Sequence, residues 1–242
     1  MKSWLITILA AAALTAVAIY FLTQRHPEET APAPPPVVAA PQKPRDMPLP
    51  PSADSDALVR KALSSLSPRP ELGRWLSQPD LLDSWVVIAD NLAEGVTPRK
   101  QLAFLAPSKP FMVRRDKIDP RSYARYDLFA DVIGSIDAKG FGAAVRELHP
   151  LLESAYHKLG YPDRKLDDLA RAALQRLIDA PAVEGDVEVV PKGALYRFAD
   201  EKLESQGAIE KHLLRMGPRN TRLIQQKARE IAAALELRVA SH

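Results

Sequence analysis

Residues 211–231 read KHLLRMGPRNTRLIQQKAREI, which is two helical segments separated by Gly217-Pro218. Glycine readily ends a helix, and proline at the first position of the next one sacrifices no hydrogen bond. The pattern therefore predicts a helix over 200–216 and a last helix over 218–238. Apolar residues recur at helical spacing along one side of the last helix, at Ile224, Ala228, Ile231 and Leu235.

The same stretch is strongly basic. Between Lys211 and Arg229 there are six Lys or Arg residues and no acid. Several of them fall on the side of the last helix opposite its apolar residues. We predict a docking face for a phosphate, a carboxylate or an acidic partner; the alternative is a solvated surface whose charges meet acids elsewhere in the fold. The candidate contact residues are Arg215, Arg219, Asn220, Arg222 and Arg229.

Helical periodicity extends upstream through most of the chain. Predicted helices cover 54–66, a short stretch around 72–76, 79–95, 120–137, 141–159 and 163–181, with Asp163 as the N-cap of the last. Pro150 should kink or split its helix near Arg146. A small ribbon over 111–118 and a strand over 187–190 are the predicted β structure. We predict a mainly α fold, with one compact multi-helix domain over 54–242 and at most minor β.

Two further segments precede this domain. Trp4–Leu22 contains 19 residues without a charge, about 28 Å of helix, which is close to the hydrocarbon thickness of a bilayer. Residues 1–23 are therefore predicted to be an uncleaved transmembrane anchor, with a cleaved signal peptide as the alternative. Residues 24–53 hold ten of the 22 prolines and are predicted to be a semi-rigid spacer.

The anchor also predicts a location. Only three residues precede the apolar run, which favours an N-terminus inside and a C-terminal domain outside, in the periplasm of a bacterium with its anchor in the inner membrane. Ala12 and Ala16 have the spacing of small residues that lets two membrane helices pack, so a homodimer is a further hypothesis. The reverse orientation would place a basic domain in the cytoplasm.

Composition excludes several classes of function. The chain has no Cys, and 33 Lys and Arg against 30 Asp and Glu give a net charge of +3. Disulfide scaffolds, thiolate metal sites and cysteine nucleophiles are thereby excluded, and no nucleic-acid partner is expected. No nucleotide-binding, zinc-protease or serine-hydrolase motif is present. We therefore predict no catalytic residue, cofactor or metal, although His149, Glu153 and His157 have the spacing of a weak candidate metal site.

A second candidate region is centred on Arg125, which lies between two tyrosines and points to the apolar side of its helix. An unpaired buried charge is costly, so an Arg–Asp–Tyr network that joins two layers of the core is expected around Arg125, with a binding pocket as the alternative. Tyr123, Arg125 and Asp127 are the candidate residues of this region. Asp127 and Asp131 should repel each other unless a cation lies nearby. The pairs Asp90/Glu94, Asp127/Asp131 and Asp167/Asp168 are alternative acid–base candidates for a hydrolase.

Five segments together resemble an uncharacterised bacterial family, domain of unknown function 3014. They are SPRPEL (67–72), NLAEG (91–95), PRKQLAFLAP (98–107), SYARYD (122–127) and HLLRMGPRN (212–220). The similarity spans about 54–237, and residues 113–119 are shorter than the β-hairpin of relatives. The resemblance implies one membrane-tethered domain, but it implies no activity, substrate or catalytic residue.

The sequence thus predicts a membrane-tethered, extracytoplasmic binding or scaffold module whose basic last helix docks another envelope protein or an anionic envelope component. The alternative function is an envelope hydrolase that uses one of the carboxylate pairs.

Overall fold

In the computed structural model, which describes residues 48–240, the first helix is α2 (Ser52–Leu63). Its apolar stripe buries Val59 and Leu63 almost completely. The same helix supplies Asp56, whose carboxylate accepts hydrogen bonds from the backbone amides of Asp80 (3.0 Å) and Leu81 (2.7 Å). Asp56 thereby caps the N-terminus of α4 (Leu81–Ala93), which begins two residues later than predicted.

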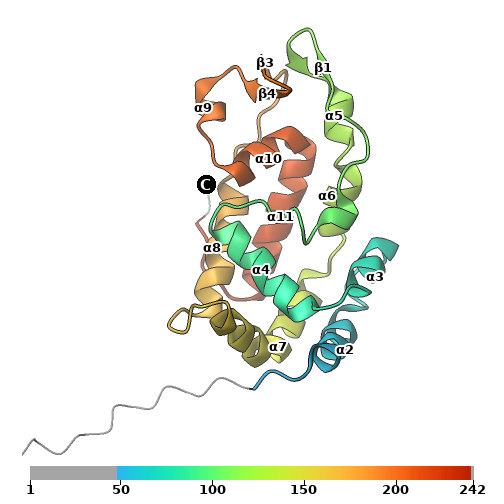
Figure 1. The fold of residues 1–242 in the computed structure, drawn as a ribbon, viewed down its shortest axis with the longest axis vertical. Helices are drawn as coiled ribbons and strands as arrows, with labels where there is room; N and C mark the ends of the chain where they lie inside the picture. The colour runs from blue at the N-terminus through green and yellow to red at the C-terminus, as the bar shows by residue number, and fades with distance from the viewer. Residues whose placement is uncertain (1–47, 241–242) are drawn as a thin grey trace, which may run out of the picture. The chain divides into compact units, whose positions relative to one another are not determined.

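The helical body is built around α4 and α11. Its other members are α3 (Pro70–Leu76), α6 (Asp127–Gly134), α7 (Ala138–Lys158), α8 (Leu166–Asp179), α10 (Ala208–Met216) and α11 (Pro218–Ala234). The α4 helix packs against α7 and α8, and α11 packs against α6, α7 and α8 (Figure 1). One apolar core joins α2, α3, α4 and α7, and a second joins α6, α10 and α11. The described residues belong to one compact, mainly helical unit, as the sequence predicts.

Two β-hairpins lie at one end of this unit, opposite α2 and α7 (Figure 1). The first pairs β1 (Val113–Arg114) with β2 (Lys117–Ile118), which confirms the predicted ribbon. The second pairs β3 (Val189–Lys192) with β4 (Leu195–Phe198); the sequence analysis found only its first strand. A third, smaller apolar core lies beneath the hairpins and contains the fully buried Phe198.

Two predicted helices are divided in the structure. The helix expected over 120–137 is α5 (Pro120–Ala124) followed by α6, with a turn at Arg125 and Tyr126 that lets Tyr126 pack into the second core. The helix expected over 200–216 is α9 (Glu201–Glu204) followed by α10, with a break that ends at Gly207. The first of these breaks contains neither proline nor glycine, so helical periodicity alone could not locate it.

Two helix boundaries also require correction. The α7 helix continues through Pro150 as one element, so it is not split, and the Ser154 hydroxyl donates to the Pro150 carbonyl (2.9 Å). The α8 helix begins at Leu166, with Lys165 at its N-cap position, so Asp163 is not the cap. Between α4 and β1 the chain is irregular except for a single 3-10 turn, η1 (Ala103–Leu105).

No helix within residues 48–240 is both long and apolar enough to cross a membrane. The predicted anchor, the pair Ala12 and Ala16, and nearly all of the proline-rich spacer lie outside the described residues. Among the described residues, Leu49 packs against the first core, so the domain begins slightly before the predicted residue 54.

Candidate functional site

The two segments singled out in the sequence meet in the structure. The α10–α11 junction packs against α5, and Gly217 at the junction has a φ of +81°. A Cβ atom built at this position would lie 2.6 Å from Cγ of Tyr123. Only glycine fits this backbone conformation and this close approach. The GP pair therefore sets the position of the residues that follow it in α11.

Asn220, in the first turn of α11, stabilises this junction through hydrogen bonds of its side chain. Its side chain is 1% exposed. The Nδ2 amide lies within hydrogen-bond distance of the Tyr123 carbonyl (3.1 Å), the Asp127 carboxylate (3.0 Å) and the Met216 carbonyl (2.9 Å). A buried amide with all its partners inside the protein stabilises the fold and is not accessible to a ligand. Asn220, a predicted contact residue, therefore has a structural role.

Arg219 supplies the cation that Asp127 and Asp131 need. Its guanidinium donates to Asp131 (2.7 Å) and lies 3.6 Å from Asp127. Arg69 approaches Asp131 from the loop before α3 (3.3 Å). The bond to Asp131 also raises the pKa of Arg219. This carboxylate pair is thus held between two arginines and joins α6 to α11.

The other predicted basic residues of α11 differ in their surroundings. Arg222 forms an ion pair with Glu184. Arg229 is exposed and forms no ion pair with a residue of the described part of the chain. The alternative to a docking face was that the basic residues meet acids elsewhere in the fold. Arg219 and Arg222 fit this alternative.

Arg125 and Arg215 belong to a different group, which also includes Arg99. The Arg125 guanidinium lies over the rings of Phe111 (5.5 Å) and Tyr126 (5.2 Å). It donates to the carbonyls of Ser122 (3.0 Å) and Lys109 (2.8 Å). The expected Arg–Asp–Tyr network is therefore wrong in its carboxylate, because backbone carbonyls take that place, whereas a tyrosine, Tyr126, does contact Arg125.

Arg215 is held in the same way. It lies over the ring of Phe198 (4.7 Å) and donates to the carbonyls of Lys211 (3.2 Å) and Tyr196 (3.4 Å). Burial lowers its pKa, and the charge of Arg99 lowers it further, while Glu204 and Tyr126 act in the opposite direction. Arg215 is thus a partly buried cation that has another cation in its neighbourhood.

His212 is linked to this group through Tyr126, whose ring Arg125 contacts, and through α10, which also carries Arg215. Its ring meets Tyr126 edge to face, with 5.4 Å between the centroids. Burial lowers its pKa to about 4, and the charges of Arg99, Arg215 and Arg125 contribute in the same direction. We call Arg99, Arg125 and Arg215 the arginine cluster. Among the described residues, no carboxylate lies within 4 Å of a guanidinium nitrogen of this cluster.

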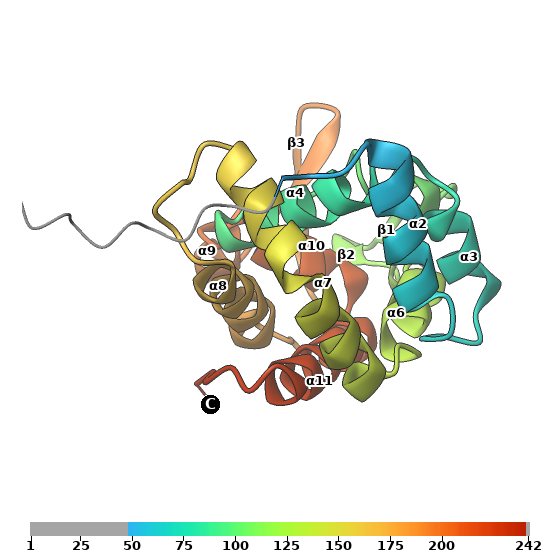
Figure 2. The same ribbon diagram turned by 90° about the horizontal axis from the view of Figure 1, so that it is seen from below.

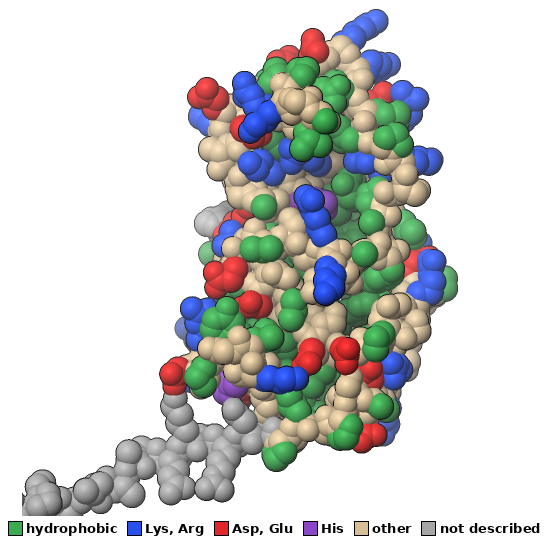
Figure 3. All heavy atoms as spheres, in the orientation of Figure 1, with side chains coloured by type: hydrophobic (Ala, Val, Ile, Leu, Met, Phe, Trp, Pro, Cys, Tyr) green, Lys and Arg blue, Asp and Glu red, His purple; other side chains and the backbone are tan. Residues whose placement is uncertain are grey.

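Figure 3 shows Lys and Arg side chains gathered around a partly visible histidine on the face that carries α4, α10 and the hairpins. Within the arginine cluster Arg99 is exposed and Arg125 and Arg215 are half-buried, so the cluster combines positive charge with access from solvent. Sequence analysis missed Arg99 and His212 as site residues. Both lie in segments that carry the family resemblance, 98–107 and 212–220, but nothing in their local spacing indicated that they meet.

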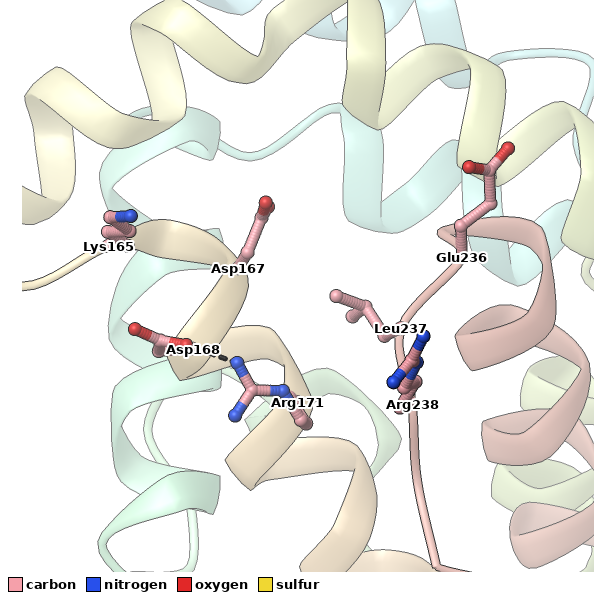
Figure 4. A pocket seen from close by; sticks show the side chains of 7 residues that line it. All are labelled: Lys165, Asp167, Asp168, Arg171, Glu236, Leu237 and Arg238. Atoms are coloured by element: carbon pink, nitrogen blue, oxygen red, sulfur yellow. Dashed lines mark hydrogen bonds and ion pairs between the residues drawn. The ribbon is translucent and has the colours of Figure 1, made fainter.

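A hollow of about 600 Å³ lies between α8 and the segment after α11 (Figure 4). It contains the carboxylate pair Asp167 and Asp168. Asp168 forms an ion pair with Arg171, and Asp167 accepts from His149 Nε2 (3.2 Å). Opposite charges thus alternate along the hollow, and no set of groups converges on one point within it.

The candidate metal ligands do not converge either. His149 faces Asp167 and lies 4.0 Å from Glu153, while His157 Nε2 donates to the Arg164 carbonyl (3.0 Å). Within residues 48–240 no group of three metal-ligating side chains is placed to hold an ion. In the pair Asp90/Glu94, burial raises the pKa of Asp90, and the charge of Glu94 raises it further.

A family model described as protein of unknown function (DUF3014) matches residues 81–232. The matched region begins with α4 and ends within α11, so it contains the α10–α11 junction and the arginine cluster. No curated protein and no solved structure matches the chain. More than half of the sequence is covered by this one model, and the chain therefore belongs to the DUF3014 family.

Proposed function

We propose that the chain is a membrane-tethered binding module that docks an anionic partner through the arginine cluster. One observation carries this proposal. The charges of Arg99, Arg125 and Arg215 all act on His212, and backbone carbonyls and aromatic rings hold Arg125 and Arg215 in place of carboxylates. Cations that have no carboxylate in contact with them repel one another, so a bound anion would stabilise the arrangement.

The tether and the location are parts of the same proposal. Residues 4–22 serve as the anchor and residues 24–53 as the spacer, with the domain in the bacterial periplasm. The partner is another envelope protein or an anionic envelope component that presents carboxylate or phosphate groups. A homodimer formed through the anchors is compatible with this arrangement.

The arginine cluster suits docking better than the front of α11. Arg219 and Arg222 are already paired with acids, so an incoming anion must compete with Asp131 or Glu184. Arg125 and Arg215 have no such competitor and are held in fixed positions. Preorganised donors lose little conformational freedom when they bind, which favours affinity.

The envelope hydrolase is the weaker alternative. Arg219 and Arg69 bind the Asp127/Asp131 pair, and Arg171 and His149 contact the Asp167/Asp168 pair. Burial raises the pKa of Asp90, but this residue does not line the hollow beside α8.

The test uses the full chain in a non-ionic detergent and a fluorescein-labelled hexaglutamate peptide, with inorganic pyrophosphate as competitor. Fluorescence anisotropy should show binding that weakens as NaCl is raised from low to physiological concentration. Replacing both Arg125 and Arg215 by Glu should reduce affinity at least about tenfold, because each charge-assisted contact contributes more than 1 kcal/mol.

The matched control replaces Arg222 and Arg229 by Glu, which changes the net charge by the same amount. Its affinity should stay within about twofold of the unchanged protein. The exposed side chain of Arg99 forms no described hydrogen bond or ion pair, so replacing it breaks no such contact. Arg99→Glu should also weaken binding of the peptide. Equal losses in the double variant and the control, or no loss in either, would contradict the proposal.

A further inference from the structure

The two β-hairpins form one small layer. Ile118 N donates to the Val187 carbonyl (2.9 Å), and Val189 N donates to the Asp116 carbonyl (2.7 Å). The ring centroids of Phe111 and Tyr196 are 6.0 Å apart. The hairpins are thus joined to each other and rest on the third apolar core. We call this layer, residues 109–118 and 187–198, the hairpin end.

The tip of the second hairpin exposes apolar side chains. Leu195 is 74% exposed, the highest value among the large apolar residues of the described chain, and Tyr196 is 38% exposed. Gly193, with a φ of +61°, begins the two-residue turn that places Leu195 at the tip. Leu195 therefore contributes little to the core beneath it and, together with Tyr196, is available for contact with a partner.

Cations surround this apolar tip. The hairpin end contains six basic residues, which are Lys109, Arg114, Arg115, Lys117, Lys192 and Arg197, against two acids, Asp116 and Glu188. Of the six, only Lys117 forms an ion pair with a described residue, Asp186. Figure 3 shows hydrophobic side chains with Lys and Arg around them at this end of the molecule.

Arg115 adds a second indication of function. Its φ is +52°, a left-handed conformation that glycine or asparagine adopts at much lower cost. A strained, charged residue at an exposed turn is retained most readily where its charge is used.

The shape of the hairpin end distinguishes between a protein and a membrane as its partner. The β3–β4 hairpin projects from the helical body (Figure 2). A protein interface needs a complementary surface of considerable area, whereas a fluid bilayer surrounds a projecting tip without prior complementarity. Leucine enters the acyl region, tyrosine suits the headgroup region, and Lys and Arg attract anionic headgroups.

We infer that the hairpin end docks on the surface of an anionic bilayer, with Leu195 inserted and the surrounding cations at the headgroups. This contact is separate from the anchor at 4–22, and it does not require the arginine cluster to bind an anion.

The chain has no cysteine, so a single reporter can be introduced without background. Ala194→Cys in the hairpin turn is labelled with an environment-sensitive fluorophore in the full chain. Ser65→Cys, exposed at the opposite end of the domain, is the control label. Vesicles contain phosphatidylcholine alone or equal parts of phosphatidylcholine and phosphatidylglycerol. The label at 194 should shift to the blue only with anionic vesicles, a quencher attached to lipid chains should quench it, and the label at 65 should not respond.

Leu195→Asp should weaken the response of the 194 label to anionic vesicles at least about tenfold in lipid concentration. Leu159→Asp, at another exposed leucine, should leave it unchanged. The inference is overturned if both labels respond equally, if neither responds, or if the 194 label responds to the hexaglutamate peptide and not to vesicles. The last result would assign the tip to an acidic protein. Peptide binding by the arginine cluster is measured separately, so the failure of one proposal can be told from the failure of the other.

Discussion

Single residues in this fold are constrained by neighbours that are distant in the sequence. Asn220 contacts Tyr123 and Asp127, which lie more than 90 positions earlier. Arg219 contacts Asp131 across 88 positions. The sequence indicated that these residues were unusual, but it did not indicate that they meet. Helical spacing shows which side of a helix a residue occupies, and it does not show which helix packs there.

His212 makes stability depend on pH. Its pKa is about 4 in the folded chain and about 6.5 in the unfolded chain. Between these values the unfolded state binds more protons, so the free energy of unfolding decreases as the pH is lowered. We expect a loss on the order of 2 kcal/mol between pH 7 and pH 5 in urea denaturation, and His212→Gln should remove most of it.

Asp119 does not interfere with that measurement. Hydrogen bonds from Arg121 lower its pKa to about 2, so its contribution is lost only below about pH 4. If His212→Gln shows the same decrease between pH 7 and pH 5 as the unchanged chain, the proposed state of His212 is wrong.

Gly217 and Gly160 form a matched pair of glycines with positive φ. A Cβ at Gly160 would meet no atom within 4 Å, whereas a Cβ at Gly217 would overlap the Tyr123 ring. Gly160→Ala should therefore cost about 1 kcal/mol from backbone strain alone, and Gly217→Ala about 3 kcal/mol or more. Thermal denaturation of both variants tests the difference, and equal costs would show that the ring moves aside freely.

At the scale of elements, the sequence predicted best the boundaries that are marked by proline or glycine. Pro70, Pro120 and Pro218 each begin a helix at the first or second position. The α5–α6 turn was missed because the packing of Tyr126 near His212 sets it, and no helix-breaking residue marks it. The β4 strand was missed because its short, partly apolar sequence resembles a loop when it is taken without β3.

The β1–β2 turn stores strain that a substitution should release. Arg115 has a positive φ, whereas Arg114 lies in extended strand β1. Arg115→Asn should raise the free energy of unfolding by about 0.5–1 kcal/mol, because asparagine tolerates the left-handed region. Arg114→Asn removes the same charge without this gain and should be neutral or slightly destabilising in urea denaturation.

At the scale of the whole molecule, composition and periodicity were sufficient to predict the fold class. They were not sufficient to predict how the charges are arranged in three dimensions. The basic stretch 211–229 is divided in three dimensions between ion pairs with acids on other elements and the arginine cluster. Arg99 enters that cluster from an irregular loop, where no periodic pattern exists to reveal it. Site prediction from the sequence therefore found the right segments and only part of the right residues.

The described domain should fold without the segments that precede it. The three apolar cores are built from residues 49–224 and later parts of α11, so a chain that begins at Asp46 should unfold within a few degrees of the full chain. A chain that begins at Pro68 loses Val59, Leu63 and the Asp56 cap of α4. Its melting temperature should fall by ten degrees or more. Calorimetry of the two truncated chains tests both statements.

The hairpin end and α2 lie at opposite ends of the domain (Figure 1). The described polypeptide enters beside α2, and the helical body lies between that entry and the two hairpin turns. A partner bound at the turns is therefore separated from the point of entry by the length of the domain.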